Sequence, residues 1–472
     1  MPPGYRQSPG NQAVASVEHV RVEPYWLGLP GRPAPTADPV PADADLVIVG
    51  AGFTGLWAAL QARERDPGRS IVVVDGGRVG AAASGRNGGF VSASLTHGLA
   101  NGLDRWPADL PELLRLGNAN LDAIEGFIHE HGIDCGWRRC GDTTFAVQPH
   151  QVEGLRELAD AGNALGEDLL FLDSPELAGR ITSPLACAGL HDRSGVALTD
   201  PAALAWGLLR VVRERGIGVC EQAPVSRIES TGSGVEVATG RGVIRAQRVL
   251  LATSAFPPLL ARLRNFIVPV YDYALVTEPL SPAQWDATGW AHREGLSDAG
   301  NRFHYFRPTA DGRILWGGYD AVHHLGREFS RAYEADRSHF ARLAEHFFQF
   351  FPQLQGVGFE YGWGGAIDTC SRFTPFWGTA SQGRVAYAVG YTGLGVGASR
   401  FAAGIALDLL DGLRTPASQL DMVRTKPLPF PPDPLRSWGI AVTTRAFTRA
   451  DETGRRGPWL RLLDRIGMGF DS

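Results

Sequence analysis

The sequence is almost free of lysine: Lys426 is the only one among 45 basic residues. Arginine therefore carries nearly all of the positive charge, and 50 acidic residues bring the formal net charge to −5. A chain without a basic excess is not expected to bind nucleic acid.

Cysteines and long apolar runs are also scarce. The five cysteines are an odd number and include no C-x-x-C pair, so they predict neither a disulfide framework nor a metal site. No segment approaches the ~20 consecutive apolar residues that a transmembrane helix requires. Residues 1–44 lack the basic-then-apolar order of a signal peptide. We therefore expect a cytoplasmic protein with reduced thiols and no transmembrane segment.

The clearest motif is a glycine-rich turn between a strand and a helix. The apolar run Leu46–Val49 predicts a buried strand, Gly50, Gly52 and Gly55 follow in G-x-G-x-x-G spacing, and a helix is expected over 53–64. In such a unit the first glycine permits the turn and the second admits a pyrophosphate. The third lets the helix pack on the strand. The helix N-terminus then faces the phosphate.

An acidic residue ends the next predicted strand, at Asp75. A carboxylate at this place accepts a hydrogen bond from a ribose hydroxyl, which favours FAD or NAD over NADP. A second strand and glycine loop occur far along the chain, at 384–390 and 391–400. Strand, glycines, helix and acid in this order predict a dinucleotide site.

The middle of the chain has a different pattern. Residues 266–278 and 302–318 are aromatic and alternating, which is typical of antiparallel strands. Alternation places Tyr271 and Tyr273 on one face of their strand, and directs Tyr305 away from His304. Helical patterns are expected at 108–131 and 151–180.

Taken together, the motifs resemble the D-amino-acid-oxidase-like superfamily of FAD enzymes, which includes glycine, sarcosine and γ-glutamylputrescine oxidases. The resemblance covers about residues 44–412, and the loop Ser84–Gly89 is most similar to the γ-glutamylputrescine oxidase branch. It implies an α/β fold in which a Rossmann-like FAD-binding domain carries an inserted antiparallel-sheet substrate domain. The expected parts are an irregular arm (1–43), the FAD-binding domain (44–100, 185–262 and 360–412), the substrate domain (101–184 and 263–359) and a C-terminal extension (413–472).

The resemblance also implies site residues. Those expected to contact FAD are Gly50, Gly52, Phe53, Thr54, Gly55, Asp75, Gly76, Ser84, Gly85, Arg86, Asn87, Gly88, Gly89, Val225, Ala252, Thr253, Gly364, Thr392, Gly393, Leu394 and Gly395. An aromatic box at the substrate is expected from Tyr271, Tyr305 and Trp363, although aromatic residues in alternating strands are more often core.

Three positions depart from the family pattern. Ile367 and Gly397 stand where an arginine or a lysine holds the substrate carboxylate in related amino-acid oxidases. Gly365 stands where sarcosine-type enzymes bond the flavin to a cysteine, so FAD is expected without a covalent bond. In the extension, Trp459, Leu462, Leu463 and Ile466 fall on one helix face that we expect to dock on the enzyme or on a second subunit.

The leading hypothesis is oxidation of an amine or amino compound to an imine, with oxygen or another electron acceptor; an oligomer is possible. A D-amino-acid oxidase or dehydrogenase and a non-catalytic FAD-binding electron-transfer subunit remain alternatives. An NAD-dependent dehydrogenase is disfavoured by the late glycine loop and the inserted sheet. Because several oxidases of the superfamily use a lysine near the flavin, the near-absence of lysine predicts slow reaction with oxygen.

Overall fold

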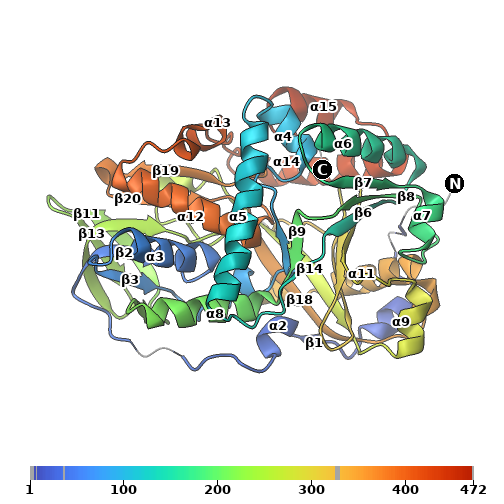
Figure 1. The fold of residues 1–472 in the computed structure, drawn as a ribbon, viewed down its shortest axis with the longest axis horizontal. Helices are drawn as coiled ribbons and strands as arrows, with labels where there is room; N and C mark the ends of the chain where they lie inside the picture. The colour runs from blue at the N-terminus through green and yellow to red at the C-terminus, as the bar shows by residue number, and fades with distance from the viewer. Residues whose placement is uncertain (1–4, 7, 36–37, 325–329, 470–472) are drawn as a thin grey trace.

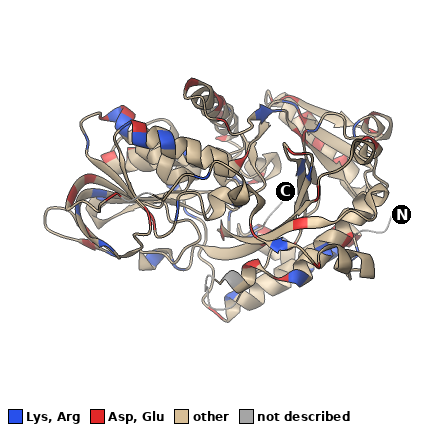
Figure 2. Cartoon of the chain, turned by 90° about the horizontal axis from the view of Figure 1, so that it is seen from below, with Lys and Arg blue, Asp and Glu red and all other residues tan. Residues whose placement is uncertain are grey.

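The computed structural model describes residues 5–6, 8–35, 38–324 and 330–469. Two sheets and the helices around them organise the chain (Figure 1). In the described ranges, no helix is both long and apolar enough to cross a bilayer. Acidic and basic residues are interspersed along the chain rather than gathered into a region of one sign (Figure 2).

The first sheet is built on parallel pairing around the glycine motif. Its order is β10-β3-β2-β13-β12-β11, with β20 on β13 and β19 on β20. The strands are β2 (Asp43–Val49), β3 (Ile71–Val74), β10 (Gly218–Cys220), β11 (Val225–Ser230), β12 (Val235–Thr239), β13 (Gly242–Leu251), β19 (Phe376–Ala380) and β20 (Val385–Val389). Leu46, Val47 and Ile48 are fully buried, as expected of a strand covered on both faces.

Four helices belong to this part of the fold. They are α3 (Phe53–Arg65), α5 (Leu110–Glu130), α8 (Pro201–Glu214) and α12 (Gly395–Asp411). Asp200 precedes helix α8, and its side chain accepts the N–H groups of Ala202 and Ala203 at 2.9 and 3.0 Å. Such N-capping satisfies donors that the helix itself leaves unpaired.

The second sheet has nine strands and is mostly antiparallel. Its order is β1-β18-β14-β17-β16-β15-β6-β8-β7. The strands are β1 (Arg21–Val22), β6 (Asp142–Ala146), β7 (Leu169–Leu172), β8 (Ala188–Asp192), β14 (Val268–Thr277), β15 (Gly295–Asp298), β16 (His304–Pro308), β17 (Ile314–Gly318) and β18 (Phe359–Thr369). Strands β8 and β18 therefore lie in this sheet, although the sequence boundaries assign most of their residues to the other domain.

The remaining elements surround the second sheet and the third, small sheet β4-β9-β5. The small strands are β4 (Phe90–Ser92), β5 (Arg138–Arg139) and β9 (Val196–Leu198), and the helices are α4 (Leu99–Arg105), α6 (Val152–Ala164), α7 (Ser174–Ala178), α9 (Pro282–Thr288), α10 (Arg331–Glu334) and α11 (Arg337–Phe350). The short helix α13 (Asp421–Arg424) packs instead against β19 of the first sheet. The single helical pattern expected at 151–180 is thus wrong, because β7 separates α6 from α7.

The N-terminal arm contains more secondary structure than the sequence predicts, and the extension contains a second helix beside the one expected around Trp459–Ile466. The arm forms α1 (Asn11–Ser16), β1 and α2 (Tyr25–Gly28), and the extension forms α14 (Leu435–Thr453) and α15 (Pro458–Arg465). The expected irregular arm is therefore wrong. Its Tyr25 and Trp26 are buried, and β1 pairs with Tyr361 and Gly362 of β18.

Candidate active site

A cavity of about 1710 Å³ runs between the parts of the chain that carry the motifs. Both glycine loops, one face of the nine-stranded sheet and the C-terminal helices line it. Pockets for drug-sized ligands measure roughly 300–1,000 Å³. The cavity therefore has room for a dinucleotide and for a substrate beside it.

The first glycine loop is shaped by close backbone approaches. Gly50 has φ +109°, and a Cβ there would lie 2.3 Å from the carbonyl oxygen of Ala252. A Cβ on Gly55 would lie 1.8 Å from the carbonyl oxygen of Gly50. Only glycine satisfies both positions. Gly55 does not line the cavity, in keeping with its predicted role in packing helix on strand.

A hydroxyl from a neighbouring loop accepts a hydrogen bond at the start of helix α3. The Phe53 N–H donates to the Ser84 hydroxyl at 3.0 Å, and a Cβ on Gly52 would lie 2.8 Å from the same oxygen. Asp75 holds the loop from the other side, accepting the N–H of Ala51 at 2.6 Å. Burial raises the pKa of Asp75 above its ordinary value.

The second glycine loop contacts the helix that follows the first glycine loop. The hydroxyls of Thr54 and Tyr391 lie 2.7 Å apart, so helix α3 and the loop before α12 meet although 337 positions separate them. Thr392 and Gly393 have φ of 50° and 96°. The His97 imidazole contacts the Thr392 carbonyl oxygen at 2.9 Å, and burial lowers its pKa, so His97 is neutral at pH 7.

Two tryptophans position the loop Ser84–Gly89. Trp26 from the arm donates to the Asn87 carbonyl at 2.9 Å, and Trp363 from β18 donates to the Arg86 carbonyl at 2.8 Å. The Arg86 guanidinium pairs with Glu334 at 2.8 Å. The loop is therefore held by contacts from helix α2, strand β18 and helix α10.

The sheet face that meets the cavity carries Asp272 rather than the expected Tyr271. Val270, Asp272 and Ala274 line the cavity, whereas the Tyr271 ring packs against His324 and Tyr333 on the opposite face. This placement corrects the inclusion of Tyr271 in the aromatic box, because alternation along β14 turns it away. Tyr305 and Trp363 do line the cavity.

Asp272 and Tyr305 form a polar pair in the cavity wall. The Tyr305 hydroxyl donates to the Asp272 carboxylate at 2.7 Å. Burial raises the pKa of Asp272 to about 6. The signal in the sequence is a carboxylate between two tyrosines in a buried strand, which sequence reasoning did not take up.

Most residues predicted to contact the cofactor line the cavity. They are Gly50, Gly52, Phe53, Thr54, Asp75, Gly76, Ser84, Arg86, Asn87, Gly88, Val225, Ala252, Thr253, Thr392, Gly393, Leu394 and Gly395. Four predicted contacts, Gly55, Gly85, Gly89 and Gly364, lie behind the wall. A Cβ on Gly364 would meet the Tyr273 ring at 2.9 Å, so this glycine faces away from the cavity.

No cation stands at the two positions where related amino-acid oxidases bind the substrate carboxylate. Ile367 lines the cavity, and a Cβ on Gly397 would lie 2.1 Å from the Ser92 carbonyl oxygen, which leaves no space for a side chain there. Gly365 lines the cavity, whereas the buried Cys370 contacts the carbonyls of Thr374 and Gly390. Within the described residues, no cysteine lines the cavity.

A family model described as FAD dependent oxidoreductase (DAO) matches residues 45–409. The chain belongs to the DAO family. It is 29% identical over 398 residues to the probable oxidoreductase OrdL of Haemophilus influenzae, covering 79% of this chain and 86% of that protein. It is also 29% identical to the gamma-glutamylputrescine oxidoreductase of Escherichia coli, covering 82% and 88%.

Solved structures show the same fold. Glycine oxidase from Geobacillus kaustophilus superposes with a TM-score of 0.67 at 19% identity, covering 82% of this chain and 100% of that chain. L-proline dehydrogenase from P. horikoshii also has a TM-score of 0.67, at 17% identity, covering 82% and 98%. The Rossmann-like α/β fold expected from the motifs is confirmed.

FAD is the cofactor of this DAO-family chain, and the cavity fits it. The Gly52 cradle lies at the N-terminus of helix α3, which suits the diphosphate. The second loop brings backbone groups of Thr392–Gly395 to the same cavity, and such groups suit the polar edge of a flavin ring. Asp75 lines the cavity at the place expected for the ribose.

A pair of carboxylates lies at another part of the cavity wall and allows a test by pH. Asp142 and Asp192 are direct partners across β6 and β8, and both line the cavity. Burial, then the negative charges of Asp192 and Glu294, raise the pKa of Asp142 from 3.8 to about 8. The folded state therefore holds a proton that the unfolded state releases.

Asp142 should accordingly make folding less favourable as pH rises from 4 to 8. We expect the Tm of the wild type to fall relative to that of Asp142→Asn over this window, with a constant difference above about pH 8. Thermal unfolding of both proteins at stepwise pH measures the difference. A Tm difference that does not change with pH, or that moves in the opposite direction, would contradict the placement of Asp142.

Proposed function

We propose that the protein oxidises a C–N bond of an amine, or of an amino compound whose acidic group lies away from the nitrogen, to an imine. Bound FAD supplies the acceptor for the hydride. The observation that carries the proposal is the lack of a cation at two positions: Ile367 lines the cavity, and Gly397 leaves no space for a side chain, so neither provides a partner for a carboxylate beside the reacting carbon. The relation to OrdL and to gamma-glutamylputrescine oxidoreductase supports it.

Three arginines that line the cavity do not replace the missing cation, because each already pairs with a carboxylate. Arg86 pairs with Glu334 at 2.8 Å, and Arg302 pairs with Asp320 at 2.5 Å. Arg436 pairs with Asp433. An α-carboxylate buried here would stay without a counter-charge, which costs several kcal/mol of binding free energy.

Asp272, Tyr305 and Trp363 have roles that follow from their positions. The Asp272 carboxylate accepts hydrogen bonds and can hold an amine N–H while it also receives the Tyr305 hydroxyl. The indole of Trp363 and the ring of Tyr305 form apolar walls that exclude water and orient the amine. We assign these residues to substrate binding.

Anaerobic reduction of the flavin by a panel of substrates tests the proposal. Amines at low millimolar concentration are expected to bleach the flavin absorption, and D-alanine and glycine to do so on the order of 100-fold more slowly, from the cost of an unpaired buried charge. L-alanine is the matched control. Rapid bleaching by D-alanine would favour a D-amino-acid oxidase or dehydrogenase. If no compound bleaches the flavin, an electron-transfer subunit is favoured.

A further inference from the structure

Helix α14 crosses the cavity with little protein beneath it. It has 19 residues, but in the described part of the chain only Arg436 and Ala450, near its ends, are buried. Between them, Trp438, Ile440 and Phe447 line the cavity. A long helix normally buries an apolar face against a core. Here that face meets the cavity instead.

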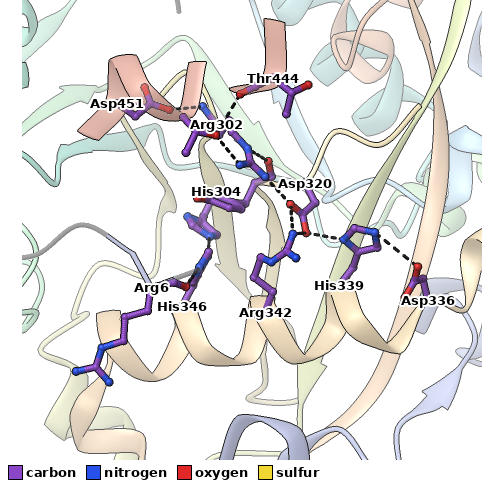
Figure 3. Close-up of polar contacts among 12 residues, drawn as sticks. Arg6, Arg302, His304, Asp320, Asp336, His339, Arg342, His346, Thr444 and Asp451 are labelled. Carbon is purple, nitrogen blue, oxygen red and sulfur yellow. Dashed lines mark hydrogen bonds and ion pairs between the residues drawn. The ribbon is translucent and has the colours of Figure 1, made fainter. Parts of the chain in front are cut away.

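Both ends of α14 are anchored to distant parts of the fold. Before the helix, the Phe430 N–H donates to the Asn265 carbonyl at 2.7 Å. At its other end, the Asp451 carboxylate accepts the backbone N–H of Asn301 at 2.9 Å, and the Arg302 guanidinium donates to the Thr448 hydroxyl at 2.8 Å. Figure 3 shows Arg302 between the end of α14 and Asp320. The helix is therefore held in place over the cavity.

Helix α15 completes an apolar wall. The Trp459 indole donates to the Thr443 hydroxyl at 2.9 Å, and its ring meets the Trp438 ring edge to face at 5.7 Å. We call the apolar cavity-lining residues of these two helices the roof: Leu435, Trp438, Ile440, Phe447, Trp459, Leu463 and Ile466. Trp438 is 59% exposed and Leu435 is 61% exposed, so the roof has apolar area left to cover.

The charged side chains near the roof form ion pairs with one another. Asp320 pairs with both Arg302 and Arg342, and Asp433 pairs with Arg436. The Nε and Nη1 atoms of Arg436 are buried without a hydrogen-bond partner. The acidic pair Asp142 and Asp192 lies on the strands of the sheet and not on the roof.

We propose that α14 and α15 are a specificity-determining wall of the active site, and that the roof receives an apolar substituent of the substrate. The roof and the two glycine loops line the same cavity. We therefore assign the group that occupies the roof to the substrate that binds in this cavity. The inference rests on the proposed function and names its substrate class: an amine with an extended aliphatic or aromatic group. The family match ends at residue 409, so the wall comes from the extension that follows it.

Binding of n-alkylamines from propylamine to octylamine tests the wall. Affinity is measured by calorimetry on holoenzyme that has been reduced beforehand, so that no turnover occurs. We expect Kd to fall by about fourfold for each methylene that the roof covers. In Trp438→Ala and Phe447→Ala the fall in Kd per methylene should be smaller. Arg445→Ala, on the exposed side of α14, is the matched control and should bind as the wild type does.

Three outcomes would overturn the inference: a Kd that does not depend on chain length, an unchanged chain-length dependence in both roof variants, or tighter binding of diamines or ω-amino acids than of alkylamines of equal length. Failure of the proposed function is distinguishable. Alkylamines would then bind with the expected dependence on chain length but would not bleach oxidised enzyme. Circular dichroism of each variant confirms that it is folded.

Discussion

Gly52→Val is expected to yield a folded protein that retains less than about a tenth of the wild-type FAD content. A Cβ at Gly52 would lie 2.8 Å from the Ser84 hydroxyl, and that hydroxyl accepts the Phe53 N–H at the start of α3. The branched side chain would displace Ser84 and fill the place where a pyrophosphate approaches the backbone. Gly52 has φ −81°, which any residue adopts, so the loss comes from occupied space and not from backbone strain.

The ratio of flavin to protein absorbance in the purified variant measures the effect. Gly232→Val is the matched control, because a Cβ at Gly232 meets nothing within 4 Å, and it should keep its FAD. Far-UV circular dichroism separates loss of cofactor from loss of fold. A folded Gly52→Val protein with unchanged FAD would show that this loop does not hold the diphosphate.

Reduced enzyme is expected to react with oxygen on the order of 100-fold more slowly than an oxidase that places a cation beside its flavin, because one preorganised charge is worth roughly that factor. Lys426 is exposed and does not line the cavity. His97 contacts the second glycine loop, but burial keeps it neutral at pH 7. Arg86 is paired with Glu334.

Stopped-flow mixing of anaerobically reduced enzyme with air-saturated buffer measures reoxidation, and an artificial electron acceptor serves as the comparison. We expect the artificial acceptor to restore turnover and oxygen to do so poorly, so that the enzyme behaves as a dehydrogenase. Reoxidation as fast as turnover, with one hydrogen peroxide formed per amine oxidised, would contradict the prediction.

The sequence predicts best where backbone geometry dictates the residue. Gly50 and Gly55 lie against carbonyl oxygens at distances that exclude a side chain, so the motif follows directly from the strand, turn and helix that it joins. The role of Asp200 also depends only on neighbouring residues, because its carboxylate caps the helix that it precedes. Such features depend on neighbours in the chain and on one fixed backbone path.

Features that depend on distant packing were missed. Alternation places Tyr271 and Asp272 on opposite faces of β14, but only the fold decides which face meets the cavity. The run Leu169–Leu172 suits a helix or a strand, and pairing with β8 decides for the strand. Helix α14 lacks the regular apolar stripe of a core helix, because its apolar residues face a cavity, so its place could not be inferred from periodicity.

The short strand β1 has a consequence for self-association. An open strand edge offers unpaired N–H and C=O groups that another chain can extend into a fibre or an aggregate. Here the outer edge of β18 is guarded: β1 pairs with Tyr361 and Gly362, and the Arg86 guanidinium donates to the Gly364 carbonyl at 3.5 Å. Because β1 has only two residues and begins with Arg21, it covers that edge without offering a long template of its own.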